Sequence, residues 1–430
     1  MLVQRIVVSF EGPGAGVGPL NWGQQQVWAA MVESDSSMSM GGVVPVEDGR
    51  VTEDFAAELR FFMSRYAAMR TRLRFEPDGA VAQEVYSRGE ATLEVHEPAD
   101  SEDPAAVAEA LAAAWRERKF DYADEWPLRM GVVRRDEKVT HVVVLMCHIA
   151  ADLGGMAVMQ RELAEPDPGP YEAPSPLDLA RLQREPAMQR QTAAAMRYWE
   201  AHLRAVPPSL LGAPADNGEP RYCRVRWESS AMHLASAALS ARLGADPAWI
   251  LLAGIATAFD RVFPGRGPFV ALGIISNRFR PALRDVVTPL TQDGLCVLDV
   301  TGATPQEAIA RARTASMSAS KYAYYDPAAR ADLTRRLNEE RGVPLDLTVL
   351  YNDRRSPRPS TVDDSRPRET RILAEEPLPF LGPKLMVIVE DVPDVVRLMV
   401  DVDTRYLPLP DVRTLLHELE SFTVTASGVG

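Results

Sequence analysis

The feature that most constrains the fold is a nearly continuous apolar run, Val139–His148, with the sequence VTHVVVLMCH. A valine-rich run of this kind is typical of a strand buried on both faces, because a half-exposed strand alternates apolar and polar residues. The stretch ADLGG, Ala151–Gly155, interrupts the run, and Met156–Ala164 then has helical spacing. The run therefore predicts a central strand that ends in a glycine-bearing turn before a helix.

Helical and strand patterns mix along the rest of the chain. Asn21 and Gln24 have the spacing of a reciprocal helix cap, and Glu53–Met69 has an amphipathic helical pattern. Further strands are predicted at Val3–Phe10, Arg224–Glu228, Phe269–Ile275, Leu345–Tyr351, Leu385–Glu390 and Val396–Val402. Because both halves mix the two kinds of element, we expect an α/β protein with two lobes.

A stretch rich in proline and acid, Glu165–Pro176, has the composition of a linker. We therefore expect an N-terminal lobe at residues 1–165, a linker at 166–189 and a C-terminal lobe at 190–430. With 430 residues in total, either lobe is long enough to bury a core of its own.

Charge and composition exclude several classes of function. The 47 basic and 60 acidic residues give a formal charge of −13, which argues against binding to nucleic acid or to an anionic membrane. The apolar runs are shorter than the roughly 20 residues of a membrane span, and the first residues lack a secretory signal pattern. We expect a cytoplasmic monomer with no membrane partner.

The three cysteines, Cys147, Cys223 and Cys296, have neither a metal-binding spacing nor the even number of a disulfide framework. Reduced thiols are therefore expected, and no metal site is predicted.

His148 is the one histidine of six that stands where a strong strand enters a glycine turn. Acyl transfer to an amine or hydroxyl needs a base of near-neutral pKa, and it needs donors for the developing oxyanion. Because side chains alternate along a strand, His148 and Met146 would share one face of the strand, and Cys147 would point to the opposite face. Asp152 follows four residues later, where it could orient the imidazole. The alternative is a core histidine satisfied by a carbonyl, with Asp152 as a helix cap, and HxxxD alone favours it.

The stretch HIAADLGGMAVMQRELAE, which begins at His148, resembles the HHxxxDG signature of condensation domains of nonribosomal peptide synthetases. Other segments resemble landmarks of that family in the same order. They are LNWGQQQVW (Leu20–Trp28), RYAAMRTRL (Arg65–Leu73), FDYADEWPLR (Phe120–Arg129), YWEAHL (Tyr198–Leu203), SNRFRP (Ser276–Pro281) and LTVLYN (Leu347–Asn352). Their order and spacing favour the family over the core-histidine alternative.

The resemblance implies a fold of two chloramphenicol-acetyltransferase-like lobes in a V-shaped pseudo-dimer with an interlobe tunnel. It places His148 at the position of the second, catalytic histidine of the signature and Asp152 at that of the structural aspartate. It makes Arg278 the expected ion-pair partner of Asp152. Asn277, in the same motif, is a candidate oxyanion or tunnel residue.

The chain departs from the family signature at two positions. Cys147 replaces the first histidine, a position that supports the site, and Leu153 replaces the glycine after the aspartate. If the turn needs φ > 0 there, leucine is strained. Leu153, Gly154 and Gly155 remain possible oxyanion or tunnel positions.

The resemblance implies a free-standing condensation enzyme of secondary-metabolite or antibiotic biosynthesis. Such an enzyme joins a phosphopantetheine-linked acyl thioester to a small amine or alcohol, forming an amide or ester, without a bound cofactor. The thioester would be carried by an acyl or peptidyl carrier protein in trans, or by coenzyme A. The alternatives are a catalytically silent module that recruits a carrier or tailoring enzyme, and a coenzyme A-dependent acyltransferase.

The tyrosines of SKYAYYD, Tyr322, Tyr324 and Tyr325, favour an interlobe packing patch over a substrate channel. The basic loop Arg354–Asp364 is a candidate docking surface for an acidic carrier.

Overall fold

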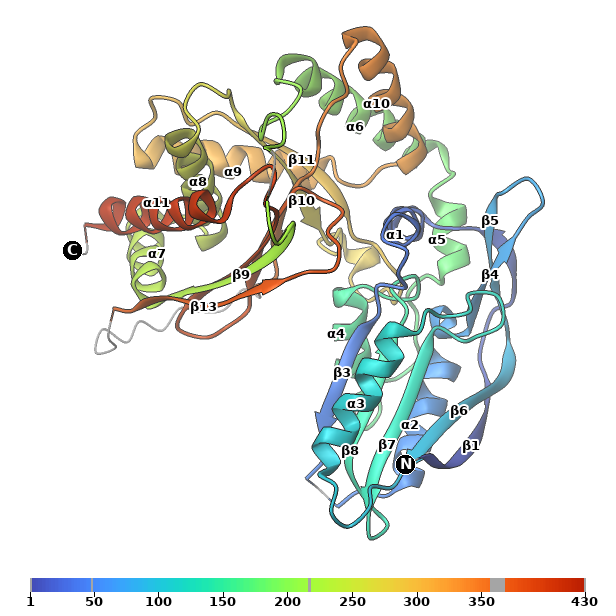
Figure 1. The fold of residues 1–430 in the computed structure, drawn as a ribbon. Helices are drawn as coiled ribbons and strands as arrows, with labels where there is room; N and C mark the ends of the chain where they lie inside the picture. Colours follow the sequence, from blue (N-terminus) through green and yellow to red (C-terminus); the bar gives the residue numbers. More distant parts are fainter. Residues whose placement is uncertain (1, 48, 216–217, 356–367, 429–430) are drawn as a thin grey trace. The chain divides into compact units, whose positions relative to one another are not determined.

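The computed structural model describes residues 2–47, 49–215, 218–355 and 368–428 (Figure 1). The chain forms two compact units. Unit 1 contains Met1–Gln189 together with Ser276–Thr291, and unit 2 contains Arg190–Ile275 together with Gln292–Gly430. Each unit combines a mixed sheet with helices, so the predicted α/β class with two lobes is confirmed.

Unit 1 is built on a five-stranded sheet in the order β1-β6-β7-β8-β3. All neighbouring strands are antiparallel except β6 and β7, which are parallel. The strands are β1 (Leu2–Glu11), β3 (Met40–Pro45), β6 (Arg88–His96), β7 (Leu128–Arg135) and β8 (Lys138–Met146).

Helices cover both faces of this sheet, which explains the apolar run in β8. Val142 and Met146 pack in one cluster with α2 (Thr52–Arg65), while Val143 and Leu145 pack in another with α3 (Pro104–Glu117). Alternate side chains of a strand point to opposite faces, so α2 and α3 lie on opposite sides. The predicted burial of this strand on both faces is confirmed.

A small antiparallel sheet and the remaining helices complete unit 1. Asn21 caps the first helix and exchanges the predicted reciprocal hydrogen bonds with Gln24. The small sheet has the order β2-β5-β4. These elements are α1 (Trp22–Glu33), α4 (Leu153–Ala164), α5 (Pro176–Leu182), β2 (Gly16–Pro19), β4 (Thr71–Phe75), β5 (Val81–Val85) and the 3-10 turns Ala67–Arg70 and Pro281–Leu283.

Unit 2 is built on a seven-stranded sheet in the order β11-β10-β12-β14-β15-β9-β13, parallel only at β10–β12 and β12–β14. Its strands are β9 (Tyr222–Ser229), β10 (Phe269–Ile275), β11 (Gln292–Leu298), β12 (Val349–Asp353), β13 (Thr370–Pro377), β14 (Leu385–Glu390) and β15 (Val396–Asp403). Its helices are α6 (Pro186–Ala205), α7 (Ser230–Leu243), α8 (Pro247–Val262), α9 (Pro305–Lys321), α10 (Pro327–Arg341) and α11 (Leu409–Ser427).

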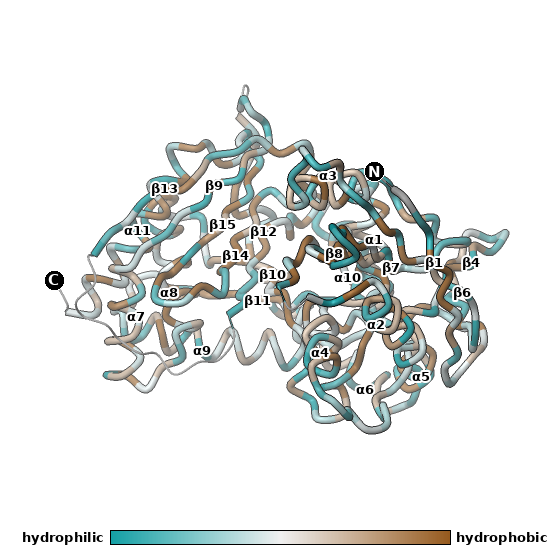
Figure 2. Tube along the Cα trace, turned by 90° about the horizontal axis from the view of Figure 1, so that it is seen from below, coloured by the Kyte–Doolittle hydropathy of each residue, from teal (hydrophilic) through white to brown (hydrophobic). Residues whose placement is uncertain are grey.

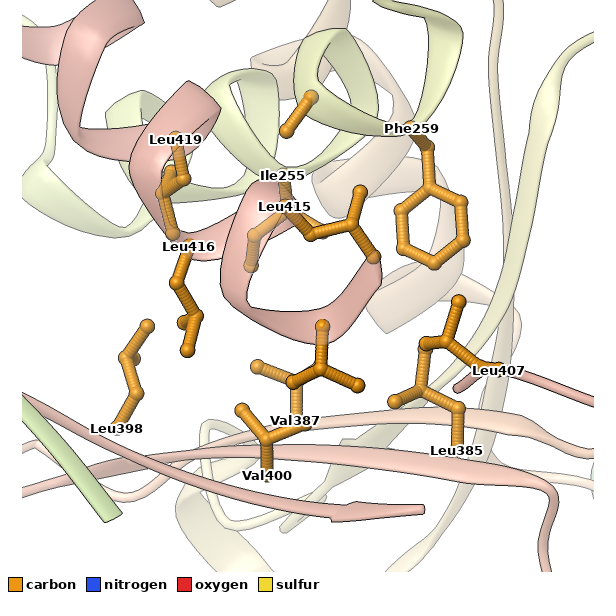
Figure 3. A pocket seen from close by; sticks show the side chains of 12 residues that line it. Ile255, Phe259, Leu385, Val387, Leu398, Val400, Leu407, Leu415, Leu416 and Leu419 are labelled. Atoms are coloured by element: carbon orange, nitrogen blue, oxygen red, sulfur yellow. The ribbon is translucent and has the colours of Figure 1, made fainter. Parts of the chain in front are cut away.

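The main core of unit 2 lies between the sheet and α8, α9 and α11, and a second cluster places α6 and α10 on the opposite face of β10. Figure 2 shows hydrophobic stretches along the inner strands β14 and β15. A small cavity remains between α8, α11 and these strands (Figure 3). The side chains that line it, among them Ile255, Phe259 and Leu419, are all hydrophobic, so the cavity offers no polar side chain to orient a substrate.

The compact units differ from the expected division at two segments. Residues 166–189 pack with unit 1 because Leu177 of α5 is buried against Ala67 and Val85, while Gln183 accepts a hydrogen bond from the backbone of Trp22. The segment Ser276–Thr291 also belongs to unit 1, and no change of composition in the sequence predicts this.

Several element bounds differ from the predicted ones. The strand predicted to end at His148 ends at Met146, and the helix predicted to end at Met69 ends at Arg65, before a 3-10 turn that begins at Ala67. The patterns in the sequence do not predict the helices α5, α7 and α10. Along the described stretches of the chain, no helix is both long and apolar enough to span a bilayer.

Neighbouring glycines of β3 give a test of the sheet. Gly41 has φ +112°, and a Cβ there would lie 2.1 Å from the carbonyl oxygen of Val144, whereas a Cβ on Gly42 would meet only the Arg116 side-chain end at 3.2 Å. Gly41→Ala should therefore lower the free energy of unfolding by more than about 2 kcal/mol. Gly42→Ala, the matched control, should change it by less than about 1 kcal/mol. Urea denaturation measures both, and equal effects would contradict the register of β3 on β8.

Candidate active site

His148 lies in a turn that follows β8 rather than in the strand itself. The backbone N–H of Cys147 donates to the carbonyl of Pro127, and the N–H of His148 donates to the carbonyl of Ser37 at 3.3 Å. The turn then closes with a hydrogen bond from Ala150 to Cys147. The expectation that strand alternation sets the direction of the His148 side chain is therefore wrong, because the strand has already ended.

The hydrogen bond of the His148 ring defines its tautomer. Nδ1 lies 2.9 Å from the carbonyl oxygen of Ala151. A carbonyl can only accept, so Nδ1 carries the proton and the neutral ring keeps a basic lone pair on Nε2. The side chain is half-buried. This arrangement supplies a histidine base whose orientation is fixed by the backbone three residues on.

Asp152 begins the helix that follows. Its extended backbone and its side chain, which accepts from the N–H of Gly155 at 2.9 Å, make it the N-cap of α4. Both contacts of the core-histidine alternative, the carbonyl on the imidazole and the aspartate cap, are thus present. The core-histidine alternative does not include an ion-pair partner for Asp152 from a distant part of the chain.

That partner is Arg278. Its two terminal nitrogens lie 2.8 Å from Oδ2 and 2.7 Å from Oδ1 of Asp152, a bidentate ion pair that is almost completely buried. The same guanidinium donates to the carbonyls of Val286 and Thr288. Burial alone opposes ionisation of the carboxyl, but the charge of Arg278 and the hydrogen bonds outweigh it, so the pKa of Asp152 lies below its ordinary value.

The segment that carries Arg278 is itself held by buried polar side chains. Asn277 is fully buried in a left-handed conformation with φ +59°, and its Nδ2 donates to the carbonyl of Leu290. Asn21, at the start of α1, donates to the hydroxyl of Thr288. One N–H of the Asn277 side-chain amide is thus used within the segment, where it holds the loop that carries Arg278.

The three residues after Asp152 have separate environments. Leu153 is the first residue of α4, is 57% exposed and has no left-handed φ, so the strain expected at this position is not present. A Cβ on Gly154 would lie 2.7–2.8 Å from atoms of Arg278, so this glycine makes room for the guanidinium. The N–H of Gly155 is occupied by Asp152. Leu153 and Gly154, whose N–H groups precede the first i→i−4 bond of the helix, remain the available backbone donors.

Cys147 faces the interior. Its Sγ lies 3.8 Å from the carbonyl oxygen of Ser37, and burial raises the pKa of the thiol to about 12. A thiol of this kind is not a nucleophile at neutral pH. Cys147 therefore packs in an apolar cluster, and the supporting role expected for it stays a prediction.

Two supports of the site were not found from the sequence. Glu162 of α4 accepts from the hydroxyl of Tyr66 and from Nε of Arg65, both at 2.6 Å, and burial together with Glu162 raises the pKa of Tyr66 well above its ordinary value. Leu290 and Thr291 donate to Oδ2 of Asp152. Glu162 stands at the spacing of a core-facing helical position, which was a usable signal, but no local pattern marked Thr291.

Other predicted features lie in unit 2. Tyr322 stacks on Tyr198, and Tyr325 packs against Trp199, so the tyrosine cluster contributes to packing within this unit. In the basic loop, Arg355 pairs with a neighbouring aspartate, and residues 356–364 lie outside the described residues. Over the described ranges, no group of three or more histidine, cysteine or acidic side chains is placed to hold a metal ion.

The buried ion pair should govern stability in acid. A depressed pKa adds stability above the unfolded-state value of about 4, and this contribution is lost as the pH falls through the folded-state pKa. Asp152→Asn leaves the Arg278 charge buried and unpaired, so it should cost about 3 kcal/mol at pH 7. The difference from wild type should narrow below pH 4, which denaturant titrations across pH would measure. The control Asp332→Asn, at an exposed pair with Arg335, should leave the unfolding midpoint nearly unchanged.

Thiol accessibility tests the placement of the cysteines. Burial raises the pKa of Cys147 and of Cys296 to about 12, and it also raises the pKa of Cys223. Native protein at pH 8 should therefore show no fast reaction with Ellman's reagent, whereas three thiols should react in denaturant. A fast-reacting thiol that disappears in Cys147→Ala would contradict the interior placement of this side chain.

Comparisons with known proteins agree with this architecture. A family model for the condensation domain matches residues 15–326. The probable non-canonical nonribosomal peptide synthetase CymA of Salinispora arenicola is 26% identical over 295 residues, a match that covers 63% of this chain but only 4% of CymA.

Two solved structures share the fold over 97% of the chain at 18% identity. One concerns condensation domain-mediated chain release from the enacyloxin polyketide synthase, with a TM-score of 0.73 and 83% of that chain covered. The other is a complex of the X-domain and OxyB from teicoplanin biosynthesis, with a TM-score of 0.69 and 95% covered. The family model spans well over half of the sequence, with the motif of His148 and Asp152 inside it, and the chain belongs to the condensation-domain family.

Proposed function

We propose that this protein is an acyltransferase of the condensation type, in which His148 is the base that activates an amine or hydroxyl acceptor. The observation that carries the proposal is the hydrogen bond from Nδ1 of His148 to the carbonyl of Ala151, which leaves Nε2 as the basic atom. A histidine with a fixed tautomer, held in the turn that follows β8, supports general-base catalysis at Nε2.

In the proposed reaction, the acceptor nitrogen or oxygen attacks the carbonyl carbon of an acyl thioester while Nε2 of His148 receives its proton. The new C–N or C–O bond forms, the C–S bond breaks and the thiolate leaves. The imidazolium returns the proton to the leaving sulfur, so the base is regenerated and no external oxidant or reductant is needed. The backbone N–H groups of Leu153 and Gly154 are the candidate donors to the oxyanion.

The identity of the donor follows from the family and stays a prediction. We expect a phosphopantetheine-linked thioester on a carrier protein supplied in trans, with coenzyme A thioesters as the alternative donor. The acceptor would be a small amine or alcohol, and no bound cofactor would be needed. The setting would be cytoplasmic assembly of a secondary metabolite. The docking of a carrier on Arg354 and Arg355 also stays a prediction.

A second function is favoured by specific observations. Cys147 replaces a signature histidine and is buried, and Leu153 replaces the signature glycine. The similar X-domain was solved in a complex with OxyB. A condensation-like module that recruits a carrier or tailoring enzyme without catalysis is therefore the competing proposal. The ionised Asp152 and its paired Arg278 are common to both functions, so the chemistry of His148 must decide.

The decisive experiment measures product by mass spectrometry from acyl carrier and coenzyme A thioesters offered with amines and alcohols. His148→Ala should lower product formation by at least about 100-fold, the range lost when a general base is removed. The matched control is His141→Ala, which removes a half-buried histidine from β8, seven residues earlier, and should retain activity.

The outcomes separate the two functions. Equal product from wild type and His148→Ala would contradict the assignment of the base. Tight binding of a loaded carrier without product, by wild type and variant alike, would favour the recruitment module. Product from coenzyme A thioesters but not from carriers would assign the protein to the coenzyme A-dependent alternative.

A further inference from the structure

The side chain of Thr291 joins the candidate site at the end of the returning segment. Its hydroxyl lies 2.8 Å from Oδ2 of Asp152, and its backbone N–H lies 3.1 Å from the same oxygen. Leu290 N–H and a terminal nitrogen of Arg278 complete the set at 2.9 Å and 2.8 Å. Oδ2 therefore accepts four hydrogen bonds, while Oδ1 accepts from Gly155 and faces Arg278 at 2.7 Å.

Only some of these hydrogen-bond donors can be deleted by a substitution. The N–H groups of Gly155, Leu290 and Thr291 belong to the backbone, and Arg278 carries the balancing charge. Across the described residues, the hydroxyl of Thr291 is the one neutral side-chain donor to this carboxylate. A carboxylate offers about four lone-pair sites in all, so its six contacts leave little freedom to rotate. The hydroxyl can be removed without removing a charge.

The carboxylate is linked to the imidazole by one peptide unit. The carbonyl of Ala151 and the N–H of Asp152 belong to the same planar group, because the peptide bond does not rotate freely. The carbonyl of Ala151 accepts the proton-bearing Nδ1 of His148. When the carboxylate of Asp152 is held in place, it therefore restricts the orientation of the Ala151–Asp152 peptide group, and this group binds the ring of His148. Ala151 and Asp152 are both buried, which adds to the restriction.

We propose that Thr291 is a positioning residue for His148. Its hydroxyl holds Asp152, and through the Ala151 carbonyl it keeps the His148 ring in the tautomer with a protonated Nδ1 and a basic Nε2. The effect on catalysis rests on the proposed function, but the effect on the tautomer does not.

The test is ¹⁵N NMR of protein labelled at histidine, with the signals of His148 identified by their loss in His148→Asn. Wild type at pH 8 should show the shifts of a fixed Nδ1–H tautomer. Thr291→Val, which has nearly the same shape but no hydroxyl, should move both ring signals toward the average of the two tautomers. Thr291→Ser, which keeps the hydroxyl, should restore the wild-type shifts.

Thr288→Val is the matched control, because it removes a buried hydroxyl from the same segment without touching Asp152. It should lower stability but leave the His148 signals in place. His148 signals unchanged in Thr291→Val would overturn the proposal, as would equal shifts in Thr288→Val. Thr291→Ala serves as the second hydroxyl-free variant if the valine variant does not fold.

Kinetics add a separate readout. Thr291→Val should lower kcat by about tenfold with little change in KM, the size expected for one charge-assisted hydrogen bond that acts on the base. Thr291→Ser should recover most of the rate. Absence of turnover in wild type would contradict the proposed function alone, since the NMR shifts would still decide the role of Thr291.

Discussion

The buried ion pair of Asp152 and Arg278 is the interaction on which the rest of unit 1 depends. Two charges taken out of water are costly, and the cost is recovered only when the geometry is good and the remaining hydrogen-bonding capacity is satisfied. Here the pair is bidentate, and further donors come from the first turn of α4 and from Leu290 and Thr291. One carboxylate thereby starts a helix, fixes the turn that bears His148 and anchors a segment distant in sequence.

The difference between local contacts and contacts distant in sequence explains which elements of the fold and which site residues were predictable. Local patterns were sufficient for β8, for the cap formed by Asn21 and for the strand Phe269–Ile275, because burial on both faces and capping are encoded within a few residues. The pairing of Arg278 with Asp152 came from a family motif. The end of β8 at Met146 and the contact of Thr291 could not be read locally, since both depend on partners brought together only by the folded chain.

The departures from the family signature are accommodated in different ways. Leu153 occupies a helical position that any residue can adopt, and its side chain points to solvent. Cys147 fills the interior, where a thiol packs as a small apolar group. Neither replacement disturbs the ring of His148.

The distance in sequence between the partners of the ion pair has a consequence for synthesis on the ribosome. Asp152 and Arg278 are 126 residues apart, and nearly all of the intervening chain from Arg190 onward belongs to unit 2. Domains generally begin to fold as they emerge, starting at the N-terminus. Asp152 of the nascent unit 1 therefore lacks its ion-pair partner until Arg278 has left the exit tunnel. Until then, the first turn of α4 lacks the ion pair that ties it to the returning segment. This turn is therefore the region of the folding intermediate that a chaperone would find exposed.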